Sequence, residues 1–148
     1  MNAKLYRSPW RDPAANLALE EALLDGRADG ELRLLLYSNE ACVVIGRNQN
    51  PWIEAAPGER VLRRISGGGA VVHGPGCLCW SFMGPRATFG LDDALGFVEA
   101  ACARLGVACA RDGRGALYAG GRKVSGSARA YRGASVLVHG TLLVSADA

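Results

Sequence analysis

Hydrophobic positions along the chain alternate between helical stretches and short runs of strand length. In residues 12–26 the leucines recur at the three- and four-residue spacing of a helix with one buried face. Asp12 can cap this helix, Pro13 suits its first position, and Gly26 ends it. Residues 91–106 repeat the apolar spacing. The sequence therefore predicts two amphipathic helices separated by a long strand-forming region.

Runs rich in β-branched and aromatic residues fill most of the remaining chain. The predicted strands are residues 31–37, 41–46, 61–65, 70–73, 77–83, 107–110, 116–119 and 121–133, followed by 134–145 as a strand pair or one long bent strand. Residues 47–52 are predicted to be a polar loop, and Gly120-Gly121 a hairpin turn. Because hairpin-like spacings dominate, we expect an α+β fold with a mixed, largely antiparallel sheet flanked by helices. We expect a single domain over residues 1–148.

The composition restricts the class of protein. Hydrophobic residues make up 49% and charged residues 21%, which is typical of a globular domain and not of a disordered chain. The apolar runs are too short to span a bilayer, and the N-terminus has no apolar signal core. We therefore expect a cytoplasmic protein without a membrane partner. The net charge of +3, without a basic stripe, argues against a nucleic-acid partner.

The five cysteines do not suggest a disulfide framework or a metal site. Their number is odd, and no Cys-x-x-Cys pair occurs. We therefore predict no metal site built from protein side chains. Most of the cysteines are expected to be small buried hydrophobes, and Cys109 is kept as a candidate nucleophile.

The segment RRISGGGAVVHG (63–74) places three consecutive glycines between two predicted strands. Successive glycines allow backbone N–H groups to turn toward an anion without side-chain clashes. Strand alternation directs only one of Arg63 and Arg64 toward that position. The alternative is a simple hairpin turn between edge strands.

Two further segments combine small residues with groups that can bind an anion. In GRKVSGSARA (121–130), Lys123 can present its ammonium group to a carbonyl or a phosphate. In VHGTLL (138–143), His139 lies in an apolar strand. The alternatives are a solvated hairpin and a structural histidine with Gly140 as a bulge. Three such segments on one small sheet favour a binding site for an anion.

Taken together, five segments resemble the lipoate–protein ligase A family of the biotin/lipoate protein ligase superfamily. The segments are NLALEEALL (16–24), VVIGRNQNPWIE (43–54), RRISGGGAVVHG (63–74), GRKVSGSARA (121–130) and HGTLLVSAD (139–147), in the order of the family. The resemblance implies the superfamily's catalytic-domain fold. It also implies a catalytic domain shortened at its C-terminus, without the accessory C-terminal domain.

The resemblance implies a two-step reaction: ATP-dependent activation of lipoate to lipoyl-adenylate, with Mg²⁺, and transfer to a lysine of a lipoyl-acceptor domain. The expected acceptor belongs to a 2-oxoacid dehydrogenase or is the glycine-cleavage carrier protein, and a second ligase subunit is a further expected partner. By the same resemblance Lys123 is catalytic. Substrate or adenylate binding is expected at Arg47, Gln49, Arg64, Ser66, Gly67, Gly68, Gly69, His73, Ser125, Gly126 and His139.

Two alternatives remain at this stage. The first is an octanoyl or lipoyl transferase that uses no ATP and carries the acyl group on Cys109. The second is a truncated domain that binds an acyl ligand without turnover. Family ligases typically have Arg-Asn-Asp-Leu where this chain has Arg114-Gly115-Ala116-Leu117, a difference that favours the second alternative.

Overall fold

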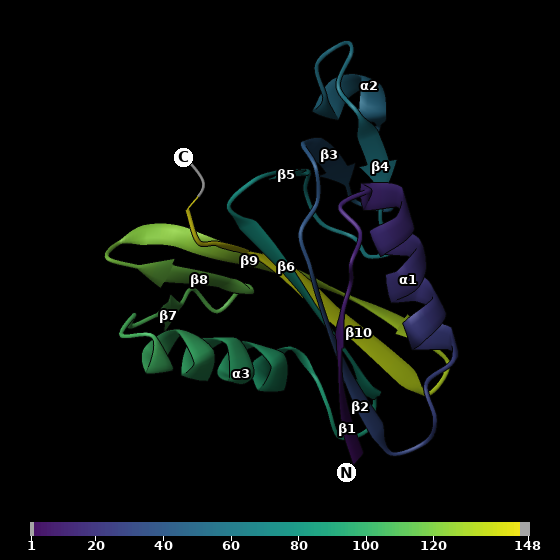
Figure 1. Ribbon diagram of the computed structural model, residues 1–148, viewed down its shortest axis with the longest axis vertical. Coiled ribbons are helices and arrows are strands. Elements are labelled where there is room, and N and C mark those ends of the chain that lie inside the picture. The colour runs from purple at the N-terminus through teal and green to yellow at the C-terminus, as the bar shows by residue number, and fades with distance from the viewer. Residues whose placement is uncertain (1, 146–148) are drawn as a thin grey trace.

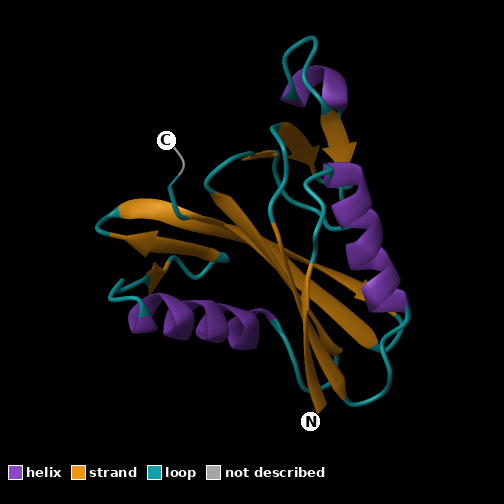
Figure 2. Ribbon diagram, viewed as in Figure 1, coloured by secondary structure: helices purple, strands orange, loops and turns teal. Residues whose placement is uncertain are grey.

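The computed structural model describes residues 2–145, which form two β-sheets and three helices (Figures 1 and 2). The helices are α1 (Pro13–Asp25), α2 (Pro51–Glu54) and α3 (Leu91–Arg104). The strands are β1 (Asn2–Arg7), β2 (Glu31–Tyr37), β3 (Cys42–Ile45), β4 (Val61–Arg63), β5 (Val71–His73), β6 (Cys77–Pro85), β7 (Ala110–Arg111), β8 (Ala116–Ala119), β9 (Arg122–Arg132) and β10 (Ser135–Leu143). Within this part of the chain, no helix has the length and apolar character needed to cross a membrane.

The strands divide between a large and a small sheet. The large sheet has the order β1-β2-β6-β10-β9-β8-β7, and the small sheet has the order β4-β3-β5. Only the β1–β2 and β3–β4 pairs among the described strands are parallel. The predicted α+β fold with a mixed, largely antiparallel sheet is therefore confirmed, with two sheets in place of one.

The two long helices lie against opposite faces of the large sheet. On one face α3 packs through Leu95 against Trp80 and neighbouring apolar side chains. On the other face α1 packs through Leu24 against the large sheet. Further up the same helix, Leu17 packs against Val44 of the small sheet. The helix α1 thus joins the two sheets on one side of the molecule, as Figure 1 shows.

The helix signals in the sequence match the observed boundaries. The Asp12 side chain accepts a hydrogen bond from the backbone N–H of Ala14 at 3.2 Å, and Pro13 opens α1. Gly26 follows the last helical residue. The Gly120-Gly121 turn is also confirmed, because both residues have positive φ and join antiparallel β8 and β9.

Several local predictions were wrong. The strand β1 and the one-turn helix α2 were not predicted, and α2 begins inside the expected loop 47–52. The expected strand over 107–110 is reduced to Ala110–Arg111. Five of the six residues of β1 are exposed, so this edge strand has no alternation of buried and exposed positions to reveal it.

The last strand, β10, is single and regular across Gly140. Its register against β6 and β9 continues without a shift from Ser135 to Leu142, so there is no bulge. A Cβ atom on Gly140 would lie 2.5 Å from the carbonyl oxygen of Gly126 and 2.5 Å from the Trp80 ring. The glycine is therefore required by close packing. The last residues of the HGTLLVSAD segment, 146–147, lie outside the described residues, as do the outer ends of the predicted domain 1–148.

Candidate active site

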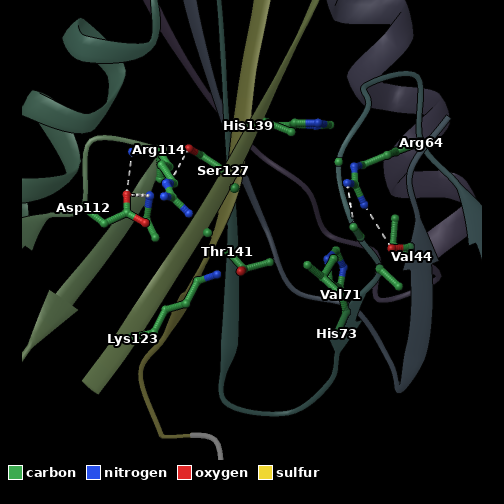
Figure 3. Close-up of a pocket in the computed structure, with 18 of the residues that line it drawn as sticks. Val44, Arg64, Val71, His73, Asp112, Arg114, Lys123, Ser127, His139 and Thr141 are labelled. Atoms are coloured by element: carbon green, nitrogen blue, oxygen red, sulfur yellow. Dashed lines mark hydrogen bonds between the residues drawn. The ribbon is translucent and has the colours of Figure 1, made fainter. Parts of the chain in front are cut away.

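A pocket of about 350 Å³ opens between the two sheets. Its small-sheet side is lined by Val44, Arg64, Gly68, Gly69, Ala70, Val71 and His73, with Leu17 of α1. Its large-sheet side is lined by Tyr37, Asp112, Arg114, Gly115, Ala116, Lys123, Gly126, Ser127, Ala128, His139, Gly140 and Thr141. Figure 3 shows Lys123, Arg114 and Thr141 facing Val71, His73 and Arg64 across the pocket.

The glycine-rich segment is a loop around a buried guanidinium and not a hairpin turn. It joins β4 and β5, which are separated by β3 in the small sheet. Arg64 is buried, and its Nη2 donates to the carbonyl oxygens of Gly67 at 2.7 Å and Gly69 at 2.8 Å. Arg63 is exposed, and its Nη1 donates to the backbone carbonyl oxygens of Gly46, Arg47 and Gln49. The prediction that only one of the two arginines points inward is confirmed.

The position of this loop depends on a second close approach. A Cβ atom on Gly46 would lie 2.1 Å from the carbonyl oxygen of Gly68. Gly68 itself has a φ of 93°, a conformation that favours glycine. The end of β3 and the glycine-rich loop can therefore be in contact only because both positions lack side chains.

A buried hydrogen-bonded chain connects α1 to the glycine-rich loop. His139 Nδ1 lies 2.9 Å from both carboxylate oxygens of Glu20, and its Nε2 lies 2.5 Å from Ser66 Oγ. Burial raises the pKa of Glu20, but its interactions with His139 and with the hydroxyl groups of Ser81 and Tyr37 lower the pKa by more. The pKa of Glu20 is therefore lowered overall. Glu20 is thus a buried carboxylate held by His139 and hydroxyl donors.

The second histidine of the pocket is held by amide side chains. Asn16 donates through Nδ2 to Asn39 Oδ1 at 2.8 Å, and Asn39 donates through Nδ2 to His73 Nδ1 at 2.9 Å. Burial lowers the pKa of His73 to about 4. His73 is therefore neutral near pH 7: its Nδ1 accepts the hydrogen bond from Asn39, and its Nε2 carries the proton.

The large-sheet side of the pocket carries cations and one carboxylate. A Cβ atom on Gly126 would lie 3.6 Å from Lys123 Nζ, so the end of the lysine side chain lies beside this glycine. Asp112 Oδ1 accepts the backbone N–H groups of Arg114 at 2.7 Å and Ala116 at 3.0 Å, and these bonds lower the pKa of Asp112. Within residues 2–145 the side chains of Lys123 and Arg114 have no ion-pair partner.

Protein side chains alone do not form a metal site in the described part of the chain, where no three His, Cys, Asp or Glu residues gather. Among residues 2–145, Asp112 is the one carboxylate that lines the pocket. Mg²⁺ is commonly held by one or two carboxylates together with substrate phosphates. A single carboxylate next to two cations therefore fits a magnesium ion that arrives with a polyphosphate.

Of the twelve residues that the resemblance places at the binding site, seven line the pocket and five do not. The residues that line the pocket are Arg64, Gly68, Gly69, His73, Lys123, Gly126 and His139. Arg47 and Gly67 line a second, open groove together with Arg63, Arg129 and Arg132. Gln49, Ser66 and Ser125 line neither. Gln49 instead accepts the backbone N–H of Gly46 at 2.7 Å, and the Ser125 hydroxyl is buried without a partner among the described residues.

Cys109 lies away from the pocket. It packs against the core cluster under α3, and it is absent from the pocket lining. Partial burial and its contact with Cys102 raise the pKa of its thiol. A nucleophilic cysteine needs the thiolate, so this environment does not favour acyl transfer through Cys109.

Several residues of the site were not predicted from the sequence. Asn39 and Glu20 are polar residues whose full burial gives no signal in a single sequence. Asp112 lies next to a predicted strand and Thr141 lies inside the VHGTLL segment, but their approach to Lys123 depends on the strand pairing of β8, β9 and β10. Only knowledge of which strands pair could have identified these two residues.

The chain is similar to known proteins over nearly its whole length. Residues 12–148 match the family described as the lipoyl protein ligase A/B catalytic domain. Lipoate-protein ligase A of Psychrobacter cryohalolentis is 35% identical over 155 residues, which cover 99% of this chain and 45% of the relative. The chain thus spans about half the length of the curated relative that it matches.

Solved structures of lipoate ligases share the fold. P. falciparum LipL1 in complex with lipoate has a TM-score of 0.87 at 25% identity, covering 99% of this chain and 48% of that one. A bi-partite lipoate protein ligase with its E2 lipoyl domain from Thermoplasma acidophilum has a TM-score of 0.85 at 25% identity, covering 99% and 63%. A lipoate-protein ligase A bound with ATP has a TM-score of 0.84 at 25% identity, covering 99% and 68%. The chain belongs to the lipoyl protein ligase A/B catalytic domain family.

Proposed function

We propose that this chain activates lipoate with ATP to lipoyl-adenylate and transfers the lipoyl group to a lysine of a lipoyl-acceptor domain. The observation that carries the proposal is a pocket that combines apolar side chains with cations. Val44 and Val71 supply apolar surface, Arg64 lies beside them, and Lys123 and Arg114, which have no ion-pair partner among the described residues, face them across the pocket. An apolar acyl chain with an anionic head group matches this combination.

The related proteins support the choice of substrates. The P. falciparum relative binds lipoate, a lipoate-protein ligase A binds ATP, and the T. acidophilum structure belongs to a lipoylation system of a bi-partite ligase and its E2 lipoyl domain. We infer the same substrates for this chain, with an acceptor from a 2-oxoacid dehydrogenase or a glycine-cleavage carrier protein. We also propose a second ligase subunit as a partner, in keeping with the bi-partite ligase.

In the first step, a carboxylate oxygen of lipoate attacks the α-phosphorus of ATP, and the bond to the bridging oxygen breaks to release pyrophosphate. Negative charge grows on the α-phosphate oxygens. The ammonium group of Lys123 is suited to stabilise this charge, because it lies in the pocket without an acidic partner among the described residues. Mg²⁺, held through Asp112 and phosphate oxygens, would neutralise further phosphate charge.

In the second step, the amine of the acceptor lysine attacks the acyl carbon of the adenylate. The amide bond forms, the bond to the phosphate oxygen breaks, AMP leaves, and the amine loses a proton. No covalent intermediate on the enzyme is required, which agrees with the position of Cys109 outside the pocket. The neutral N–H of His73 is available to donate a hydrogen bond to an acceptor atom of the ligand.

The proposal is tested by the transfer of labelled lipoate to a lipoyl-acceptor domain, with and without ATP. We expect labelling only with ATP, and a decrease on the order of 100-fold in Lys123→Ala because one preorganised charge is removed. Lipoate affinity, measured by calorimetry, should decrease much less. The matched control is Arg122→Ala, which removes the exposed neighbouring cation on β9 outside the pocket.

Two further readouts separate the steps. Release of pyrophosphate measures activation alone, and addition of prepared lipoyl-adenylate measures transfer alone. Unchanged activation in Lys123→Ala would contradict the role of this lysine. No pyrophosphate release by the wild-type protein with ATP, Mg²⁺ and lipoate would contradict the proposed activity.

A further inference from the structure

Four buried polar side chains form a continuous hydrogen-bonded series along the wall of the pocket, and two of them, His139 and Arg64, line it. It runs from Glu20 of α1 to His139 of β10, then to Ser66 and Arg64 of the segment that follows β4. Arg64 Nε lies 3.0 Å from Ser66 Oγ. Each of the four side chains is at least nine-tenths buried. These hydrogen bonds therefore connect three distant parts of the sequence at the point where the two sheets meet.

The inventory of donors and acceptors fixes the direction of these bonds. Ser66 Oγ accepts the N–H of Arg64 Nε, so its own hydrogen is available for His139 Nε2. If Nε2 carried a proton, Ser66 would receive two N–H donors, and its hydroxyl hydrogen would have no acceptor among the described residues. Nε2 is thus the acceptor, and Nδ1 carries the proton that His139 donates to Glu20.

Arg64, the last residue of this hydrogen-bonded series, lines the pocket. Arg64 Nε donates to Ser66 Oγ, and one N–H of Nη1 donates to the carbonyl oxygen of Val44. The two N–H groups of Nη2 donate to the carbonyl oxygens of Gly67 and Gly69. Of its five N–H groups, one on Nη1 has no acceptor within residues 2–145. Arg64 lines the pocket and also the second groove, so an anionic ligand in the pocket can reach its guanidinium.

We propose that Glu20 is a positioning residue for the pocket: it holds His139 as the Nδ1–H tautomer, and through Ser66 it sets the orientation of the Arg64 guanidinium that receives the ligand's anionic group. This inference rests on the proposed function, because it assigns the ligand's carboxylate, and later its acyl phosphate, to Arg64. The proposal separates Glu20 from residues that contact the substrate, since Glu20 does not line the pocket.

The first test is the tautomeric state of the histidines, measured by NMR of the wild-type protein labelled with ¹⁵N-histidine at pH 8. The protein contains only two histidines, and they should be in opposite tautomeric states. We expect His139 to carry its proton on Nδ1 and His73 to carry its proton on Nε2, because Asn39 donates to His73 Nδ1. Loss of one signal set in His73→Gln assigns the spectrum. A proton on Nε2 of His139 at this pH would overturn the proposal.

The second test compares variants at both ends of the chain of hydrogen bonds. Glu20→Met removes the acceptor at similar volume, and we expect the Nδ1–H tautomer to be lost and lipoate affinity to decrease roughly tenfold. Glu20→Gln keeps an acceptor oxygen and should restore most of both properties. Ser66→Ala should decrease lipoate affinity similarly while His139 keeps its Nδ1 proton. The control is Glu21→Met, because Glu21 is on the same helix and, among the described residues, pairs only with Arg132 at the surface.

These outcomes are separable from those of the proposed function, because neither NMR nor lipoate binding requires ATP. If Glu20→Met does not fold, the wild-type spectrum and Ser66→Ala still decide the question. Wild-type lipoate affinity in Ser66→Ala, or an unchanged tautomer in folded Glu20→Met, would overturn the positioning role. A failure of ATP-dependent transfer in the wild-type protein would contradict the proposed function and leave these readouts intact.

Discussion

At the scale of single residues, the most sharply constrained position in the large sheet is Gly140. An alanine there would bring its Cβ within 2.5 Å of the carbonyl oxygen of Gly126 and of the Trp80 ring. We expect Gly140→Ala to lower the free energy of unfolding by roughly 3 kcal/mol, the upper part of the range for overpacking. Urea unfolding measures this change.

The control substitution should change the free energy of unfolding in the opposite direction. Gly96 lies inside α3, and a Cβ there would meet only the end of the Arg111 side chain at 3.4 Å. Gly96→Ala should therefore raise the free energy of unfolding by up to about 1 kcal/mol, since alanine is the better helix former. Equal stability of Gly140→Ala and wild type would mean that β10 can shift away from Trp80 without cost.

At the scale of elements, the contact between β3 and the glycine-rich loop sets the wall of the pocket. Because a Cβ on Gly46 would lie 2.1 Å from the Gly68 carbonyl oxygen, Gly46→Ala must displace the loop. We expect lipoate affinity to fall at least tenfold, by calorimetry, because Arg64 is held by the carbonyl groups of this loop. Gly74→Ala is the matched control, because its Cβ would meet nothing closer than 3.9 Å. Wild-type affinity in Gly46→Ala would show that the loop does not position Arg64.

Elements with strong local signals could be predicted from the sequence, and elements without them could not. The helix α1 has a capping residue, a proline at its first position and a glycine after its end, and each signal acts within one turn. The strand β1 has no such signal, because its position depends on pairing with β2 at an exposed edge. The division into two sheets was also missed, since strand composition does not specify partners.

At the scale of the whole molecule, the site is made by segments that are far apart in the sequence. The motifs around Gly68, Lys123 and His139 were visible as local combinations of small and polar residues, and the structure brings them to one pocket. Glu20 and Asn39 gave no signal, because their roles come from contacts 119 and 34 residues away in the chain. Buried polar residues of this kind are recognised only once the fold has brought their partners together.

The buried histidine of this pocket also determines how the stability of the whole molecule responds to acid. Burial lowers the pKa of His73 to about 4 from 6.5. Between these pH values the unfolded chain binds more protons than the folded one, so stability increases with pH and is lost on acidification. The loss between pH 7 and pH 4 should reach about 3 kcal/mol from this residue alone. Urea unfolding at several pH values should show a smaller loss in His73→Gln, whose side chain has no proton to gain. If wild type and variant lose the same stability over this range, the acid sensitivity arises elsewhere, and His73 is not held neutral by the fold.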